Sequence, residues 1–477
     1  MEKKSGLIGN LFWKFAERIT AQFVTLIVSV VLVRILEPSH YGIIAIVEIF
    51  ITLANVLVSD GFGSALIQKK DADELDFASV FYFNLGFSIF LYCCLFIAAP
   101  YIANFYGKEY AILVPVLRVL GIRIIISGIN SVQQAYVSRH MIFKKFFWAT
   151  LFGTSVSAVV GIIMAITGFG VWALVAQYLT NTIVDTIVLN LSIKFKPIRK
   201  FSWNRLKSLL NYGIKILATS MLISFYQELR ALIVGKVYSS SDLAFYDKGK
   251  QFPSLIIINI NTSISAVLFP KMSQQQDNLV LVKETARKLI KFSSFFMCPM
   301  MVGLAVVADA FVSVVLTDKW LPCVPLLRLF CIVYLFQPIH SANMQAIKAI
   351  GRSDVYLKLE IIKKTIELAS LLFVMKISVK AIVISMAVLT FLFTFVNAYP
   401  NIKLLNYGIR EQIKDIFPSL GMSGIMALLI FPIQMLQLPK VVILVMQVIV
   451  GIVIYSLIAL LTKNEQFFYI LRIIKRR

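Results

Sequence analysis

The chain has 477 residues, of which 59% are hydrophobic and only 15% are charged, whereas an ordinary soluble domain is about half apolar and a quarter charged. This composition excludes a soluble globular protein and a disordered chain, and the five Cys residues lie in apolar runs that do not suit a disulfide scaffold. The 47 Lys and Arg outnumber the 24 Asp and Glu, and in so apolar a chain this excess indicates a basic membrane face rather than a nucleic-acid partner.

Long apolar runs follow one another along the chain, each with about the 20 residues that a membrane-spanning helix needs. The unbroken runs at 23–33 and 441–461 favour helices over the short alternating strands of an outer-membrane barrel. We predict about 14 spans in groups of six, six and two, near residues 11–36, 41–66, 78–105, 111–135, 144–167 and 169–193, then 208–235, 243–270, 287–316, 322–347, 354–375 and 379–402, and finally 414–437 and 440–462.

The predicted fold is an all-α polytopic membrane protein with two six-helix lobes. A polar linker at 194–207 separates an N-terminal lobe at 1–200 from a second lobe at 201–408, and two further helices with a basic tail occupy 409–477. The sequence V-P-V-L-R at 114–118 recurs as V-P-L-L-R at 324–328, and Gln134-Ala135 recurs as Gln345-Ala346. Because six spans separate the two copies, we expect lobes related by a pseudo-twofold axis along the membrane normal, with a cleft between them.

Basic residues mark one predicted face of the membrane. Alternate loops contain about thirty Lys and Arg, and the remaining loops contain about six. The positive-inside rule therefore predicts an even number of spans with cytoplasmic N- and C-termini. The first apolar run is too long for a cleavable signal peptide and lacks a small-residue cleavage site.

Motifs for catalysis are missing from the sequence. Its three His and five Cys do not have the spacing of metal ligands, and neither a phosphate-binding loop nor a nucleophile elbow occurs. We therefore expect no enzyme activity, no catalytic residue, no metal and no cofactor. Any transport would then be driven by the substrate gradient or by a coupled ion such as H⁺ or Na⁺.

Charged side chains at membrane depth are costly unless they face a polar cavity or reach the headgroups. We predict a cationic cleft for an anionic substrate, formed by Arg18, Arg34, Arg123 and Arg230, with Lys14, Lys215 and Lys248 as further candidates. The alternative for residues near span ends is that they extend to the headgroups, as for Lys14, Arg34, Lys215, Lys248 and Lys363. Three acids on the same helices would tune these cations or couple an ion: Glu17, Glu228 and Asp247.

Residues 34–42 read R-I-L-E-P-S-H-Y-G, which resembles the R-x-L-x-P-x-x-Y-G signature of Wzx-like polysaccharide transporters in the MOP superfamily of flippases. The V-P-V-L-R segment and the Q-Q-A segment at 133–135 are also similar to that family. The resemblance implies a bacterial inner-membrane protein that moves undecaprenyl-diphosphate-linked oligosaccharide repeat units to the periplasmic leaflet by alternating access, for O-antigen, capsule or exopolysaccharide synthesis. It implies as partners the lipid-linked oligosaccharide, membrane lipids, a glycan polymerase and glycosyltransferases, but no nucleic acid.

Two other functions stay open at this point. A multidrug or organic-cation exporter of the same superfamily would need a cavity carboxylate without a neighbouring base, whereas bases outnumber acids on the first, fourth and eighth predicted spans. A membrane-embedded glycan polymerase or ligase would need a large outer loop with catalytic groups, and every predicted outer loop is short.

Overall fold

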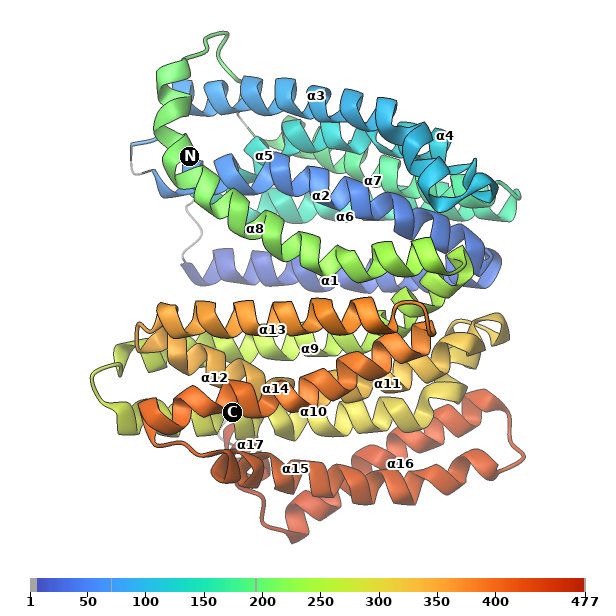
Figure 1. Cartoon of the computed structure of the whole chain (residues 1–477), viewed down its shortest axis with the longest axis vertical. Helices are drawn as coiled ribbons and strands as arrows, with labels where there is room; N and C mark the ends of the chain where they lie inside the picture. The colour runs from blue at the N-terminus through green and yellow to red at the C-terminus, as the bar shows by residue number, and fades with distance from the viewer. Residues whose placement is uncertain (1–6, 70, 194, 476–477) are drawn as a thin grey trace. The chain divides into compact units, whose positions relative to one another are not determined.

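The computed structural model describes residues 7–69, 71–193 and 195–475, and the regular structure in these residues is helical (Figure 1). Internal contacts form two compact units, Met1–Ala244 (unit 1) and Phe245–Arg477 (unit 2). Unit 1 contains α1 (Leu7–Ile35), α2 (Pro38–Gln68), α3 (Glu74–Tyr106), η1 (Lys108–Tyr110), α4 (Leu113–Leu120), α5 (Ile122–His140), α6 (Phe143–Ile166), α7 (Val171–Ser192) and α8 (Trp203–Val237).

Helix α9 (Ser240–Gln274) begins in unit 1 and continues into unit 2. Unit 2 also contains α10 (Leu279–Val315), η2 (Asp318–Cys323), α11 (Val324–Leu335), α12 (Gln337–Ala349), α13 (Ser353–Val374), α14 (Val379–Leu405), α15 (Ile409–Ile430), η3 (Phe431–Met435), α16 (Lys440–Leu461) and α17 (Glu465–Lys475). The predicted lobe boundary near residue 200 follows the sequence repeat, whereas the contacts divide the chain after Ala244 because α8 packs on α2 and α3. The symmetry axis and the cleft between lobes stay predictions.

Twelve helical segments in the described residues are long and apolar enough to cross a membrane, which confirms the predicted all-α membrane fold. The predicted count of 14 is not confirmed, because α1 has only a shorter apolar stretch, Thr20–Ile35, and α13 is not among the twelve. Helix α13 is not apolar enough to count as a span, because its 22 residues include six charged side chains between Asp354 and Glu367.

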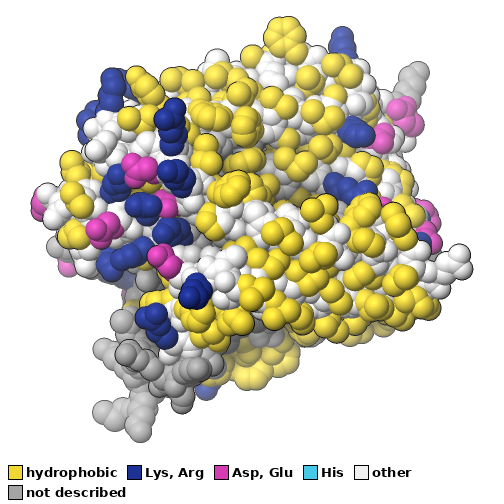
Figure 2. All heavy atoms as spheres, turned by 90° about the horizontal axis from the view of Figure 1, so that it is seen from below, with side chains coloured by type: hydrophobic (Ala, Val, Ile, Leu, Met, Phe, Trp, Pro, Cys, Tyr) yellow, Lys and Arg dark blue, Asp and Glu magenta, His cyan; other side chains and the backbone are white. Residues whose placement is uncertain are grey.

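The face drawn in Figure 2 has the surface expected of a membrane protein. Apolar side chains form a broad band, and the Lys, Arg, Asp and Glu side chains gather at its two ends. Exposed residues of α15 and α16, such as Leu428, Val445 and Ile452, are 76%, 49% and 64% exposed. Side chains of this kind are stable at such exposure when lipid, not water, surrounds them.

The predicted spans at 111–135 and 322–347 are each broken into two helices, α4–α5 and α11–α12. A short 3₁₀ helix precedes each pair, and the repeated motif makes the same contact in both units. The Nε of Arg118 donates to the Phe96 carbonyl of α3 at 3.4 Å, and that of Arg328 donates to the Ala305 carbonyl of α10 at 3.0 Å. The motif arginine thus ties each broken span to the long helix that precedes it.

Small residues on one face of α6 allow α7 to approach closely. The buried residues of α6 recur every four positions: Ala149, Gly153, Ser157, Gly161 and Ala165. A Cβ at Gly161 would lie 2.9 Å from the Cβ of Gln177, and one at Gly153 would lie 3.1 Å from the Cβ of Asp185. This small-residue stripe is the usual device for packing helices in lipid, where no hydrophobic force draws them together.

The packing of Gly42 explains why the R-x-L-x-P-x-x-Y-G motif ends in glycine. The start of α9 crosses α2 so closely that a Cβ on Gly42 would lie 1.8 Å from the carbonyl oxygen of Ser240. Because the obstructing atom belongs to the backbone, a rotamer change cannot relieve the overlap. Only glycine permits this crossing within unit 1.

Gly42→Ala should therefore destabilise the protein by at least about 1–3 kcal/mol, the usual cost of overpacking. The matched control is Gly86→Ala on α3, where an added Cβ meets no atom within 4 Å. Thermal unfolding of the purified proteins in detergent would measure the difference. Equal melting temperatures for the two variants would contradict the close crossing.

Candidate functional site

Four of the seven predicted cations have side chains that the structure describes. Arg34 is exposed in the last turn of α1, and Arg230 is half-buried on α8 with an interaction partner. Arg123 and Lys248 are more deeply placed, in unit 1 and unit 2 respectively. The remaining three side chains lie outside the described residues: Lys14, Arg18 and Lys215.

Arg123 belongs to a polar network that joins three helices of unit 1. Its guanidinium forms an ion pair with Glu48 on α2, and its Nε donates to Thr182 Oγ1 on α7 at 3.3 Å. Its Cζ also lies 5.1 Å from the centroid of the Tyr178 ring. Glu48 balances the charge of Arg123. The contacts of Arg123 connect its own helix, α5, with α2 and α7. Whether it also contacts substrate stays a prediction.

Lys248 is buried at a contact between α9 and the start of α11. It is 8% exposed, and its Nζ donates to Gln251 Oε1 at 3.1 Å. Asp247 lies close enough to interact with its charge. The adjacent Gly249 allows the approach, since a Cβ there would lie 3.1 Å from the backbone nitrogen of Leu327. Lys248 is therefore held inside unit 2 by its own helix and by α11.

The three predicted acids are each half-buried and each has an interaction partner. Glu228 lies on α8 two residues before Arg230, and Asp247 precedes Lys248 on α9. Glu17 lies on α1, where its carboxylate is near enough to Asp185 of α7 for the two charges to interact. The structure thus brings Glu17 near a second carboxylate.

Unit 2 contains a polar cavity of about 420 Å³ between α9, α12 and α13, which we call the α12–α13 cavity. Its lining residues are Phe269, Gln337, His340, Ser341, Met344, Gln345, Lys348, Tyr356, Glu360 and Lys363. Seven of these ten side chains carry a charge, an amide, a hydroxyl of serine or an imidazole. Such a lining is unfavourable against lipid, so it indicates a site for a polar ligand or water.

The charges of the α12–α13 cavity come from two lysines and one glutamate. Lys363 is 9% exposed, and its Nζ contacts Glu360 Oε1 one turn away at 2.5 Å. The Nζ of Lys348 lies 4.1 Å from the centroid of the Tyr356 ring. Because a single carboxylate faces two ammonium groups, the cavity is net positive and favours an anion.

Hydrogen-bonding groups surround these charges. His340 Nε2 lies 3.0 Å from Thr394 Oγ1 on α14, and Lys363 is close enough to His340 for their charges to interact. The amides of Gln337 and Gln345 can both donate and accept, as the hydroxyls of a sugar require. The cavity therefore combines cations for a phosphate with amides and an aromatic ring for sugar.

None of the cavity lysines was among the predicted site residues. Lys363 was expected to extend toward headgroups, and Lys348 was expected in a basic loop, but both line the α12–α13 cavity. One signal in the sequence did point to this place, since Gln345 belongs to the Q-A pair that recurs in the internal repeat. The sequence could not show that α13 turns Lys363 toward α12 instead of toward lipid.

An apolar groove of about 580 Å³ also lies in unit 2, between α10, α15 and α16. Its lining includes Phe296, Met300, Val448 and Ile452, which are 42–64% exposed. A groove this apolar and this open suits a hydrocarbon chain.

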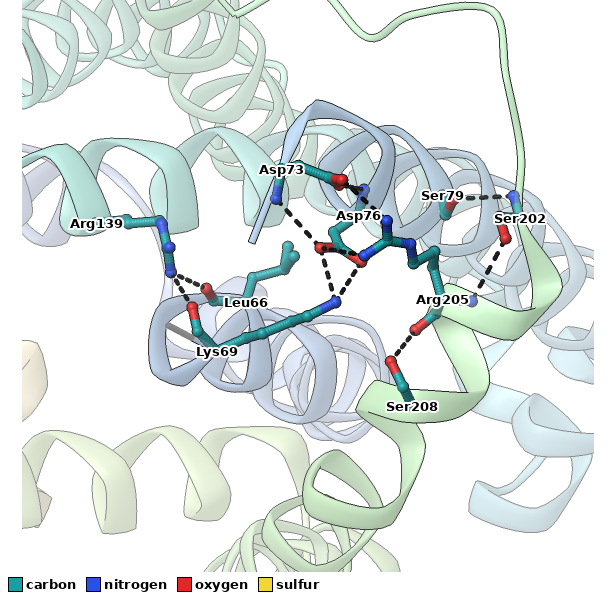
Figure 3. Close-up of polar contacts among 9 residues, drawn as sticks. All are labelled: Leu66, Lys69, Asp73, Asp76, Ser79, Arg139, Ser202, Arg205 and Ser208. Atoms are coloured by element: carbon teal, nitrogen blue, oxygen red, sulfur yellow. Dashed lines mark hydrogen bonds and ion pairs between the residues drawn. The ribbon is translucent and has the colours of Figure 1, made fainter. Parts of the chain in front are cut away.

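Figure 3 shows an ion network that joins the ends of α2, α3 and α8 in unit 1. Asp76 is fully buried, and Lys69 Nζ contacts its two carboxylate oxygens at 2.7 and 2.8 Å. Arg205 of α8 lies 3.8 Å from Asp76 and 3.2 Å from Asp73. The backbone N–H of Asp76 donates to Asp73 at 2.9 Å, and this bond, aided by Arg205, holds the pKa of Asp73 below its usual value.

Unit 2 has a corresponding network around Asp415 on α15. Asp415 is 4% exposed, and Arg287 of α10 donates to it through Nε and Nη2, both at 2.8 Å. The hydroxyl of Tyr407 donates to the same carboxylate at 2.8 Å. Burial and the charge of Asp415 raise the pKa of Tyr407, so its hydroxyl remains a donor. Each unit thus fixes its helix ends through one buried aspartate.

A family model described as "Polysaccharide biosynthesis protein" matches residues 31–325. The teichuronic acid biosynthesis protein TuaB of Bacillus subtilis is 24% identical over 63% of this chain and 62% of its own length. The lipopolysaccharide biosynthesis protein WzxC of Escherichia coli is 22% identical over 76% of this chain and 74% of its own length. The match therefore spans less than two thirds of TuaB and about three quarters of WzxC.

The fold is similar to that of the lipid II flippase MurJ in an inward closed conformation. The two structures superpose with a TM-score of 0.75, covering 95% of this chain and 99% of MurJ. Their sequences are 15% identical, so this likeness shows the fold alone.

Replacing Asp76 by Asn should destabilise unit 1, because Lys69 and Arg205 would lose their shared counter-charge. Removing one partner of a fully buried pair costs about 3–5 kcal/mol, and a smaller loss is expected here because both bases keep some contact with water. Glu74→Gln is the matched control, since Glu74 is exposed in the first turn of the same helix. Melting temperatures that are lowered equally in the two variants would contradict a structural role for Asp76.

Proposed function

Because the chain belongs to the polysaccharide biosynthesis protein family, we propose that it is a flippase that moves undecaprenyl-diphosphate-linked oligosaccharide repeat units across the bacterial inner membrane by alternating access. Such units supply the synthesis of O-antigen, capsule or exopolysaccharide. The expected resemblance to Wzx-like polysaccharide transporters is confirmed by the family match and by the similarity to WzxC. The membrane-spanning helices and the fold agree with transport.

The observation that carries this proposal is the α12–α13 cavity. A lipid-linked oligosaccharide presents a diphosphate and a sugar headgroup, and the cavity offers a cation for the first and amides for the second. Lys348 and Lys363 would contact phosphate oxygens, and Gln337 and Gln345 would bind sugar hydroxyls. The ring of Tyr356 provides a face on which a sugar can stack.

The lipid part of this substrate has a matching feature in the same unit. A polyprenyl chain is a long hydrocarbon, and the groove between α10, α15 and α16 is apolar and open. Placing the chain there would leave only the polar headgroup to be moved through the protein. The predicted cations Arg34 and Arg230, together with Lys14, Arg18 and Lys215, remain candidates for further contacts with the diphosphate.

The remaining parts of the proposal follow from this activity. Both termini would lie in the cytoplasm, as the basic loops predict. The flippase would receive its substrate from glycosyltransferases and deliver it to a glycan polymerase, without catalysing a reaction itself. H⁺ or Na⁺ would be the coupled ion.

The alternative of a multidrug or organic-cation exporter has less physical support. A cationic drug needs an uncompensated carboxylate in its cavity, whereas Glu360 contacts Lys363 and a second lysine lines the same cavity. This arrangement repels cations and attracts anions.

The double variant Lys348→Gln/Lys363→Gln should reduce flipping about a hundredfold or more, because it removes two charge-assisted hydrogen bonds to phosphate that contribute about 1.5–3 kcal/mol each. The measurement is accumulation of lipid-linked sugar in cells that lack the native gene and express the variant. Lys376→Gln is the matched control, since Lys376 is exposed in the turn after α13. Normal glycan export by the double variant, at the wild-type protein level, would refute this site.

A further inference from the structure

A second basic pocket in unit 2 has no role in the proposed glycan site. It has a volume of about 450 Å³ and lies between the end of α9, the start of α10 and α17, so we call it the α10–α17 pocket. It shares no lining residue with the α12–α13 cavity. Its basic side chains come from two helices, Lys271 from the last turn of α9 and Arg287, Lys288 and Lys291 from α10.

Two of these four bases are already neutralised by carboxylates. Arg287 donates to Asp415 through two nitrogen atoms, and Lys291 Nζ lies 3.2 Å from Glu465 Oε2. These ion pairs join α10 to α15 and to α17. They therefore hold the walls of the α10–α17 pocket in place, and their charges are not available to a ligand in full.

The other two bases, Lys271 and Lys288, are uncompensated. Both are exposed, and neither forms an ion pair or a hydrogen bond with another described residue. Once the two ion pairs are set aside, Glu284 supplies the remaining carboxylate among the described lining residues. Two lysines against one carboxylate leave a single positive charge, which matches an anion with a single negative charge.

The sequence of α10 places this charge where the hydrocarbon core of the membrane ends. The charged residues near the start of the helix all precede Phe292, and residues 292–315 contain a single charged residue, Asp309. A stretch of this length is enough to cross the hydrocarbon core, for which about 20 residues are needed. The α10–α17 pocket is therefore at the depth of the lipid headgroups.

The rest of the lining suits the border between headgroup and hydrocarbon. The rings of Phe292 and Tyr469 are 5.3 Å apart, and Tyr469 is 54% exposed. Aromatic side chains of this kind are enriched at membrane surfaces. Gln466 is only 8% exposed, yet its side-chain amide has no hydrogen-bond partner among the described residues. A hydroxyl or a phosphate oxygen in the pocket would satisfy this amide.

The charge balance favours a phosphodiester over a diphosphate. A phosphodiester carries one negative charge, which Lys271 and Lys288 can neutralise. A diphosphate carries more negative charge, and the excess would lie beside Glu284 and Glu465 without a cation to balance it. The pocket is thus a poor site for the diphosphate of the lipid-linked glycan, whereas a phosphodiester is the anionic group of membrane phospholipids.

We propose that the α10–α17 pocket binds the headgroup of an anionic phospholipid from the surrounding membrane. Lys271 and Lys288 contact the phosphate, Gln466 contacts a headgroup hydroxyl, and the acyl chains remain in the bilayer. The bound lipid connects α9, α10 and α17, so it stabilises the folded state of unit 2. This site does not depend on the proposed flippase function.

The test measures the melting temperature of the purified full-length protein in neutral detergent micelles, without any glycan. Dioleoyl phosphatidylglycerol is titrated in one arm and dioleoyl phosphatidylcholine in the other, because a ligand of the native state raises its melting temperature. We expect phosphatidylglycerol to stabilise wild type at a concentration at least about fivefold lower than phosphatidylcholine does. The variant Lys271→Gln/Lys288→Gln should need about tenfold more phosphatidylglycerol, or more, for the same gain.

Three further variants show whether the pocket or basic charge in general is responsible. Lys196→Gln/Lys200→Gln removes two exposed lysines of unit 1 that also have no described partner, and it should respond as wild type does. Lys271→Arg/Lys288→Arg keeps the charge and should retain the response. Lys288→Gln alone should lose part of the response, and it replaces the double variant if that protein does not fold.

Two other ligands distinguish the sources of the anionic group. Inorganic phosphate should not reproduce the stabilisation, and any effect of undecaprenyl diphosphate should be equal in wild type and in Lys271→Gln/Lys288→Gln. Equal responses to the two phospholipids, a wild-type response in the lysine-to-glutamine variants of the pocket, or an equal loss in the unit 1 control would overturn the proposal. A stabilisation by either phosphate compound that the pocket variant abolishes would also overturn it. Because transport is not measured, failure of the flippase proposal would leave these results unchanged.

Discussion

The hydrocarbon core of the membrane supplies no hydrogen bonds, and this constraint governs every polar side chain within the spans. The chain meets it by pairing polar groups between helices. Asn84 of α3 donates to Ser131 of α5 at 3.1 Å, and Gln133 of α5 donates to Asn190 of α7 at 3.2 Å. Because these groups have no better partner in lipid, each pair fixes the rotation of two helices about their axes.

The polar groups of the spans consequently divide into two kinds. Those with complete partners, such as the Arg123–Glu48 pair, hold helices together and resist rearrangement. The others surround a polar cavity, as Lys348 does. Such incomplete arrangements are costly in an empty protein, and a bound ligand would offset the cost. The anion site proposed in unit 2 follows from this reasoning.

The ends of the helices obey a different rule, because water and lipid headgroups are available there. Buried aspartates still organise these ends: Asp76 joins α2, α3 and α8 (Figure 3), and Asp415 joins α10 with α15. Arg118 and Arg328 likewise make the same main-chain contact in the two units. The internal repeat therefore preserves particular interactions at helix ends, whereas the polar interior differs between the units.

The sequence by itself determined the class of protein, most of its spans and its family. Apolar length, basic loops and the motif at 34–42 are local properties, so they can be read without knowing how the helices pack. The tertiary structure decided which charges are paired and which line a cavity. Arg123 forms an ion pair with a glutamate 75 residues away in the sequence. Lys363 lines the cavity beside α12, although the many charged residues of α13 would also suit a helix exposed to water. These outcomes depend on the rotation of each helix about its axis, which is set by the close contacts of residues such as Gly153 and not by the hydrophobicity of any segment.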